Sequence, residues 1–302
     1  MIEELKKIYR RLRKIYYSYI KAWFVYRETA RWQILDNWQT LDYLQAHHCS
    51  IGRYGDGEFG IVGGQGNGFQ LPDAKLAERL KEVILSDDAP NFMVGVPYPL
   101  KYFKDLIRGH AFWPEYTSRN IQLLRTLIRP NKTYLNTQVT RFYFERKDKS
   151  RCKEHLQKLR SLWDNRDIVI VEGTMTRSGV GNDLYSNAKS VRRILGYSEN
   201  AFEHYDEMLD TIVNNTNTRQ LILLCYGMTA TVLAYDLAKL GYWAMDIGHL
   251  DIEYEWMRMG TMERALIKGK HVNELKEVGG ADVGQCEDPL YIQQIMADIT
   301  KK

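Results

Sequence analysis

The sequence predicts an α/β protein in which a mostly parallel sheet is covered by helices on both faces. Short apolar segments typical of buried strands alternate with amphipathic helical segments along most of the chain. The clearest strand is the run DIVIV at residues 167–171, which is continuous, rich in β-branched residues and bounded by charged residues. Strands that alternate with helices in this way pair in parallel, because each helix carries the chain back to the start of the next strand.

The first 46 residues are predicted to form a helical extension, and residues 47–302 are predicted to form the main domain. In residues 1–30, apolar side chains recur at steps of three and four, as expected for one amphipathic helix. Residues 31–48 are predicted to form a second helix that ends at His47 and His48.

Charge is unevenly distributed along the chain. Residues 1–21 carry seven Lys or Arg and two Glu, a net charge of +5, so the remaining chain sums to −1 out of a total of +4. The helix over residues 1–30 could lie on an anionic membrane surface, pair with a second copy or another protein, or simply pack on its own domain. The near-neutral body is not typical of a nucleic-acid-binding surface, and we expect no nucleic-acid partner.

The four cysteines are scattered, which fits a reducing compartment, and we see neither a signal peptide nor a membrane-spanning run. We therefore expect a cytoplasmic protein, in contact with the inner face of the membrane if residues 1–30 bind lipid.

Beyond residue 48, strand and helix signals follow one another in a regular order. Strands are predicted over residues 51–54, 92–96, 133–136, 167–171, 221–225 and 243–247. Helices are predicted over residues 73–85, 118–128, 151–163, 201–213 and 229–240, with Asp73 and Thr229 as N-caps. Residues 279–302 give no clear signal.

The first candidate site follows the strand at residues 51–54, in the glycine-rich segment RYGDGEF. Asp56 and Glu58 can offer hard oxygen ligands to one divalent cation. Arg53 can pair with a phosphate or with one of these carboxylates. The alternative interpretation is a tight turn in which Asp56 caps the next helix.

The second candidate site follows DIVIV. Its candidate residues are Arg177, Gly179, Gly181, Asn182 and Asp183, with Arg193 further along the chain. Glycines after a strand expose backbone N–H groups that can bind an anion, and the two arginines could neutralise phosphate charge. Asn182 and Asp183 could contact a ribose, a base or the ligands of a metal. The alternative is a loop shaped by its glycines, with Arg177 bound to Glu172.

The third candidate site is the acidic segment DIGHLDIEYEW at residues 246–256, after the last predicted strand. On a helix, Asp251 and Glu255 would share a face and Glu253 would point nearly opposite, whereas on an extended segment all three would line one side. Carboxylates mixed with Ile, Tyr and Trp are expected to be partly buried, with the altered proton affinity that a general base requires. His249 is a weaker candidate for a catalytic group.

These motifs, in this order, resemble the bacterial glycosyltransferases of the GT-D fold type, a family long described as a domain of unknown function. The resemblance covers residues 47–270 and includes Phe69-Gln70 and Asn200-Ala201. It implies a Rossmann-like domain, a UDP-sugar donor, and a divalent metal, Mn²⁺ or alternatively Mg²⁺, placed by Asp56 and Glu58. The phosphates of the donor would then lie near Arg53 and the Arg177 loop.

The resulting prediction is a metal-dependent glycosyltransferase that moves a hexose, glucose or galactose, from a UDP-sugar to a glycan or glycoprotein hydroxyl in surface polysaccharide or glycoprotein biosynthesis. Glu253, and after it Asp251, is the preferred general base, which implies inversion at the anomeric carbon. Two alternatives are a metal-dependent phosphohydrolase of nucleotide sugars and a non-catalytic subunit that binds sugar nucleotides or glycans.

Overall fold

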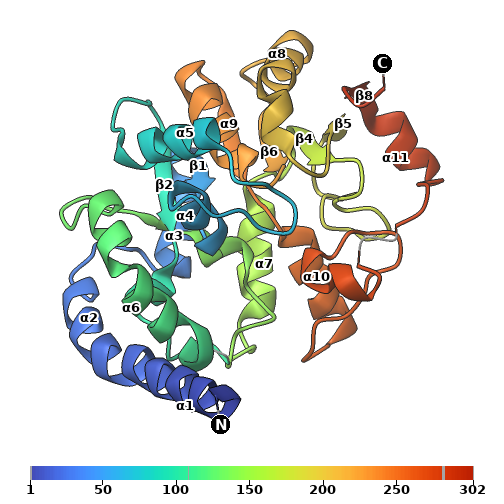
Figure 1. Ribbon diagram of the computed structural model, residues 1–302. Coiled ribbons are helices and arrows are strands. Elements are labelled where there is room, and N and C mark those ends of the chain that lie inside the picture. The colour runs from blue at the N-terminus through green and yellow to red at the C-terminus, as the bar shows by residue number, and fades with distance from the viewer. Residues whose placement is uncertain (1, 108, 281–282, 302) are drawn as a thin grey trace.

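A single parallel sheet forms the centre of the molecule (Figure 1). The computed structural model describes residues 2–107, 109–280 and 283–301. In this part of the chain, eight strands pair in the order β3-β2-β1-β7-β6-β4-β5-β8, and every pairing is parallel. The predicted α/β fold with a Rossmann-like parallel sheet is therefore confirmed.

The strands include two that the sequence did not predict. The strands are β1 Ser50–Arg53, β2 Phe92–Val96, β3 Leu135–Asn136, β4 Asp167–Gly173, β5 Ser190–Gly196, β6 Leu221–Cys225, β7 Trp243–Asp246 and β8 Ile295–Asp298. The missed strands are β5 and β8. β5 begins with the polar run SVRR, whose first residues are not buried, and β8 is a short, half-buried strand at the edge of the sheet.

The helices mostly match the predicted ones. They are α1 Ile2–Ile15, α2 Ala22–Thr29, α3 Asn37–His47, α4 Asp56–Val62, α5 Ala74–Leu85, α6 Gly109–Leu127, α7 Cys152–Ser161, α8 Tyr205–Asn215, α9 Thr229–Lys239, α10 Leu250–Met259 and α11 Pro289–Gln294. A π-helical turn, η1 Tyr16–Lys21, joins α1 to α2. The 3₁₀ turns are η2 Tyr98–Leu100, η3 Thr137–Thr140, η4 Ala201–His204 and η5 Asn273–Val278.

Two helix starts and one helix cap differ notably from the prediction, and α8 begins at Tyr205 because residues 201–204 form the 3₁₀ turn η4. α3 begins at Asn37, because Asp36 and Gln39 form a capping box in which each side chain accepts a hydrogen bond from the other's backbone N–H, at 2.9 and 3.0 Å. α6 begins at Gly109 and contains Pro114, a residue usually excluded from helix interiors. Thr229 does not cap α9: the helix starts there, and the capping position is Met228.

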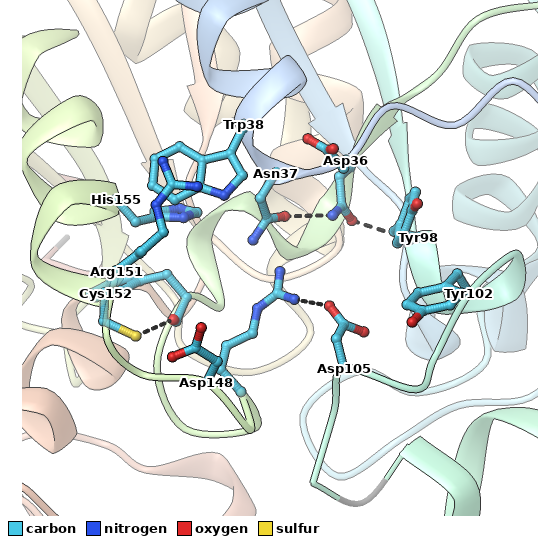
Figure 2. A pocket seen from close by; sticks show the side chains of 13 residues that line it. Asp36, Asn37, Trp38, Tyr98, Tyr102, Asp105, Asp148, Arg151, Cys152 and His155 are labelled. Carbon is cyan, nitrogen blue, oxygen red and sulfur yellow. Dashed lines mark hydrogen bonds and ion pairs between the residues drawn. The ribbon is translucent and has the colours of Figure 1, made fainter.

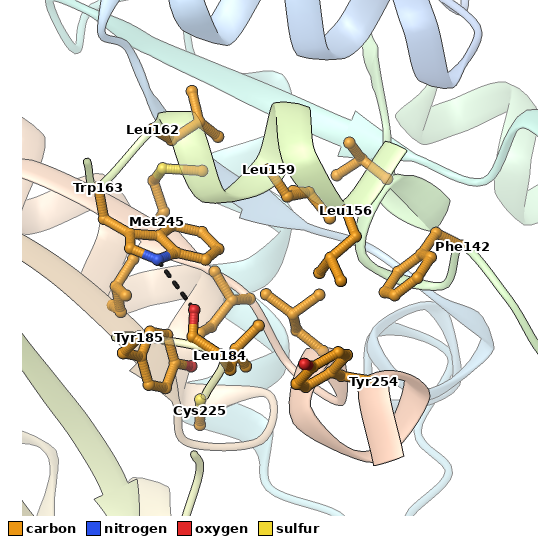
Figure 3. Close-up of a cluster of buried hydrophobic side chains, with 14 of the residues drawn as sticks. Phe142, Leu156, Leu159, Leu162, Trp163, Leu184, Tyr185, Cys225, Met245 and Tyr254 are labelled. Carbon is orange, nitrogen blue, oxygen red and sulfur yellow. Dashed lines mark hydrogen bonds between the residues drawn. The ribbon is translucent and has the colours of Figure 1, made fainter. Parts of the chain in front are cut away.

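Strand β4 is buried on both faces of the sheet, because helices cover both sides. Ile168 and Ile170 face a core layer built with α3, α7 and α10, whereas Val169 and Val171 face the layer built with α8 and α9. All four side chains are fully buried, and successive side chains of a strand point to opposite faces. Figure 3 shows part of the first layer, where the indole N–H of Trp163 donates to the Leu184 carbonyl at 3.3 Å.

The N-terminal helices divide into a buried and an exposed part. In Figure 1, α1, η1 and α2 form one rod that runs beside α6, and Val25 of α2 is buried in the core. Further on, Trp32 and the α3 residue Leu44 are also fully enclosed core residues. The division of the chain at residue 46 stays a prediction. No helix within the described ranges combines the length and apolar character needed to cross a membrane.

Candidate active site

The first site residues meet where the carboxyl ends of β1 and β7 lie side by side. The chain leaves β1 toward one edge of the sheet and leaves β7 toward the other, which makes this pair the switch point where α/β proteins bind ligands. Arg53 at the end of β1 donates from Nη2 to Oδ1 of Asp246, at the end of β7, over 3.0 Å. Its Nη1 donates to Thr140 Oγ1 at 2.7 Å and to the Thr137 carbonyl at 3.1 Å. Arg53 therefore clamps the two strand ends together.

Asp56 and Glu58 lie in the first turn of α4, directly after β1. Asp56 is exposed, and Glu58 is partly buried. Glu58 Oε2 accepts a hydrogen bond from the backbone N–H of Gly55 at 2.6 Å, so Glu58 rather than Asp56 satisfies the helix start. Burial, reinforced by the nearby Asp246 carboxylate, raises the pKa of Glu58 to about 7.

A divalent cation at these carboxylates would need further ligands from a substrate or from water. Among the described residues, no group of three or more His, Cys, Asp or Glu side chains could hold a metal ion. Mg²⁺ sites of this kind commonly use one or two protein carboxylates and complete their shell with substrate phosphates and water. Asp56 and Glu58 carry hard oxygen atoms, but residues two apart on a helix do not share a face, so their joint binding of one cation stays a prediction.

The glycine loop after β4 is attached to helix α10. Asp251 Oδ1 accepts hydrogen bonds from the backbone N–H of Gly179 at 2.9 Å and from Asn182 Nδ2 at 2.7 Å. The same Asn182 nitrogen donates to Glu255 Oε1 at 2.6 Å. Both carboxylates also accept from Lys270 Nζ, at 2.7 Å for Asp251 and 3.0 Å for Glu255. Asp251 and Glu255 thus share one face of a helix, as predicted for the helical case, and hold the loop in place.

Two further contacts join the same loop to the same helix. The Tyr254 hydroxyl donates to Asp183, and Arg258 Nη1 donates to the Gly181 carbonyl at 3.2 Å. Gly179 and Gly181 both have positive φ angles, of 77° and 74°, which glycine adopts without strain. The loop conformation therefore depends on its glycines and on α10 together.

The two arginines predicted to face phosphate, Arg177 and Arg193, are buried and bound to protein groups. Arg177 donates to the carbonyls of Gly269 at 2.9 Å, Val283 at 2.8 Å and Gly284. It fixes the C-terminal loop and does not pair with Glu172, which was the alternative interpretation. The roles of both arginines toward a nucleotide stay predictions.

The partner of Glu172 is Arg193. Their ion pair of 2.5 Å is almost wholly buried, and Arg193 also donates to the Ser178 carbonyl at 2.8 Å and to Gln294 Oε1 at 2.8 Å. This pair joins the missed strand β5 to β4 and to the start of the glycine loop.

Glu253 lies on the opposite face of α10 and is only 1% exposed. Its Oε2 accepts hydrogen bonds from the backbone N–H groups of Tyr143 and Phe144, both at 2.9 Å. Within the described part of the chain, its Oε1 has no hydrogen-bond partner. Burial raises the pKa of Glu253, although nearby Arg141 opposes the rise. Glu253 is thus a buried carboxylate held by one oxygen, with its other oxygen free to accept a proton.

Sequence reasoning missed the cations that surround the acidic helix. Lys270 is 4% exposed and lies in a polar loop with no pattern to mark it. Arg141, near Glu253, pairs with Glu274 at 3.0 Å. Burial lowers the pKa of His249 to about 4, so this imidazole is neutral at pH 7. The only signal for Lys270 and Arg141 would have been the rule that buried carboxylates need partners.

A family model described as the glycosyltransferase GT-D fold matches residues 51–275. The chain is 36% identical over 265 residues to glycosyltransferase GlyD of Streptococcus pneumoniae serotype 4, a match that covers 86% of this chain and 32% of that protein. It is 34% identical over 268 residues to a probable glycosyl transferase, Gly, of Streptococcus gordonii, covering 87% of this chain and 38% of the other. The chain therefore spans only about a third of the length of these curated relatives.

Solved structures resemble nearly the whole chain. One, described as the highly conserved domain of unknown function 1792 with a distinct glycosyltransferase fold, has a TM-score of 0.86 and 31% identity, and the match covers 92% of this chain and 99% of that one. Another, described as a new glycosyltransferase from Streptococcus sanguinis, has a TM-score of 0.83 and 34% identity, covering 88% and 99%.

Proposed function

Because the chain belongs to the glycosyltransferase family with the GT-D fold, we propose that it transfers a hexose, glucose or galactose, from a UDP-sugar to a hydroxyl of a glycan or glycoprotein. The observation that carries the proposal is the close match to glycosyltransferase-fold structures along almost their entire length. The clustering of Asp56, Glu58 and Asp246 at the switch point of the sheet supports a site for a charged donor there.

The donor end of the proposed site has to stabilise the diphosphate that leaves the sugar. Asp56 and Glu58 would hold a divalent cation, for which we propose Mn²⁺ with Mg²⁺ as a substitute, and this cation would neutralise charge on the leaving group. Arg53 would contribute positive charge from the end of β1, while its bond to Asp246 keeps the guanidinium in a fixed position. The glycine loop, held by Asp251 and Lys270, would position the remaining donor contacts.

Glu253 is the proposed general base that accepts the proton of the attacking acceptor hydroxyl, which makes the reaction inverting. Its free Oε1 and raised pKa support this choice. Asp251 is the weaker candidate, because Gly179, Asn182 and Lys270 already occupy its two oxygens.

We further propose that residues 1–30 bind an anionic membrane surface on the cytoplasmic side. The apolar stripe of this rod is open to solvent, with Leu12 61%, Trp23 58% and Phe24 62% exposed. Seven basic residues accompany the stripe within residues 1–21. Exposed aromatic and aliphatic side chains beside clustered Lys and Arg are what an interfacial helix uses on anionic lipid.

The test is a panel of UDP-sugars with and without Mn²⁺, read first by thermal shift and then by transfer to a panel of glycan acceptors. A donor that binds the native state raises its Tm, and we expect this rise only when the cation is present. Transfer that requires an acceptor supports the proposal. Rapid cleavage without acceptor would favour the hydrolase alternative, and binding without turnover would favour a non-catalytic subunit.

A further inference from the structure

A cavity of about 340 Å³ opens beside the proposed site, at the carboxyl ends of β2 and β3 (Figure 2). Its lining includes Trp38, Tyr98, Tyr102, Asn37, Asp105 and Asp148. Small-molecule sites in proteins typically measure about 300–1,000 Å³, so this volume suits one small ligand better than a whole nucleotide sugar. None of the motifs in the sequence pointed to it.

One buried hydrogen-bond donor in the lining of the cavity has no acceptor among the described residues. Asn136 Oδ1 accepts from the backbone N–H groups of Tyr98 at 3.1 Å and Gln138 at 2.9 Å, which fixes its amide orientation. Asn136 Nδ2 must then donate, and it does so to Asn37 Oδ1 at 2.5 Å. Asn37 is 4% exposed, its Nδ2 has no partner among the described residues, and Figure 2 shows this nitrogen pointing into the open space above Asp148.

The same lining holds a buried hydrogen-bond acceptor that has no donor within the described ranges. Asp105 pairs with Arg146 through Oδ2, and its Oδ1 is buried without a hydrogen-bond partner in the described ranges. Buried polar groups left unpaired are costly, and a ligand with hydroxyl groups can satisfy a donor and an acceptor at once.

The charges of the cavity argue against a phosphate. Arg146 is bound by Asp105, and Arg151 stacks over the Trp38 ring at 3.7 Å while donating to Glu154 at 2.9 Å. Both cations are therefore already engaged, whereas diphosphate recognition needs free ones. Aromatic rings beside carboxylate and amide groups instead suit a neutral, hydroxyl-rich ring with an apolar face.

One short segment joins the cavity to the proposed catalytic groups. Asn136 and Phe142 line the cavity, while Thr137 between them contacts Arg53, and Tyr143 beside Phe142 donates to Glu253. Residues 136–144 thus run from the lining of the cavity to the contacts with Arg53 and Glu253, so the cavity and the proposed catalytic groups share one segment of chain.

We propose that this cavity is the acceptor subsite, which binds a neutral hexopyranose unit of the acceptor glycan through Asn37 and Asp105. This inference rests on the proposed glycosyltransferase function. It assigns the cavity to the acceptor and leaves the donor at the β1–β7 switch point.

The experiment uses the full chain with Asn37→Asp and Asp105→Asn. Asn37→Asp keeps the oxygen that Asn136 needs and removes the free donor, and Asp105→Asn alters the free acceptor. Tyr102→Ala, at a ring that is 45% exposed, perturbs the cavity without disturbing the core. The matched control is Asp167→Asn, a carboxylate paired with Lys189 at the amino end of β4, at the opposite edge of the parallel sheet from the cavity.

Binding of methyl glucoside, methyl galactoside and methyl N-acetylglucosaminide is measured by saturation-transfer NMR without donor. The wild type and Asp167→Asn should give signals, and the three cavity variants should lose most of them. In the transfer assay, Asn37→Asp and Asp105→Asn should each raise the acceptor KM about tenfold, with an unchanged Tm shift from UDP-sugar.

Equal NMR signals in all variants, or no signal in the wild type, would overturn the inference. The NMR measurement needs no donor, so it still decides the cavity if no UDP-sugar binds. In that case the absent Tm shift contradicts the proposed function separately.

Discussion

The substitution Glu58→Gln tests whether burial and the neighbouring Asp246 carboxylate raise the pKa of Glu58. The pKa of Glu58 rises from 4.5 to about 7 in the native protein. At about 1.4 kcal/mol for each pKa unit, ionising Glu58 costs the native state about 3 kcal/mol. The native state holds this proton more tightly than the unfolded chain, so the contribution is fully present below pH 4.5 and is lost as pH rises through about 7.

The assay is the free energy of unfolding from urea denaturation at steps between pH 5 and pH 8, for the wild type and for Glu58→Gln. The glutamine introduced by this substitution cannot ionise, yet its side-chain oxygen can still accept from the Gly55 N–H. The difference in the free energy of unfolding between the wild type and Glu58→Gln should therefore change by about 3 kcal/mol from pH 5 to pH 8. The variant becomes more stable relative to the wild type as the pH rises. For a chain of this size that free energy corresponds to about 5 °C in Tm.

The matched control is Glu154→Gln, an exposed carboxylate whose pKa Arg151 lowers. The contribution of Glu154 to stability is fully present above the pKa that this side chain has in the unfolded chain, and it is lost only at lower pH. The difference in the free energy of unfolding between the wild type and Glu154→Gln should therefore be constant from pH 5 to pH 8. Adding Mn²⁺ and the donor found in the panel at pH 8 should stabilise the wild type more than Glu58→Gln. A flat wild-type-minus-Glu58→Gln curve would refute the reasoning about Glu58.

Three other perturbations give separate expectations. Glu253→Gln should lower transfer by about 10²–10⁴-fold and leave the Tm shift from UDP-sugar intact, and wild-type rates would rule Glu253 out as the base. Lys270→Met should lower the free energy of unfolding by about 3–5 kcal/mol, because Asp251 and Glu255 lose a buried cation, whereas Lys189→Met at an exposed ion pair should cost less than about 1 kcal/mol. The pair Leu12→Glu and Trp23→Ser should abolish sedimentation with phosphatidylserine vesicles, whereas a changed solution mass with unchanged lipid binding would indicate self-association instead.

The strands and helices could be predicted wherever their pattern is local. DIVIV at β4 alternates between two core layers, and Asp251 and Glu255 share a helix face, because strand and helix periods place side chains by backbone geometry alone. β5 was not predicted, because its two arginines are typical of surface or ligand-binding positions. Arg193 is buried only because Glu172, 21 positions earlier, lies beside it in the sheet.

The sequence alone determined the fold class, the order of the motifs and their place at the strand ends, because these follow from short-range periodicity and from the parallel arrangement that alternating strands and helices require. Only the tertiary structure decided which charges meet. Lys270 forms an ion pair with Asp251, and Arg177 donates hydrogen bonds to carbonyls of the C-terminal loop. The Asn37 amide, which has no partner for its nitrogen among the described residues, lines a cavity. The partner of a buried polar group is set by packing between distant segments, which no local pattern encodes.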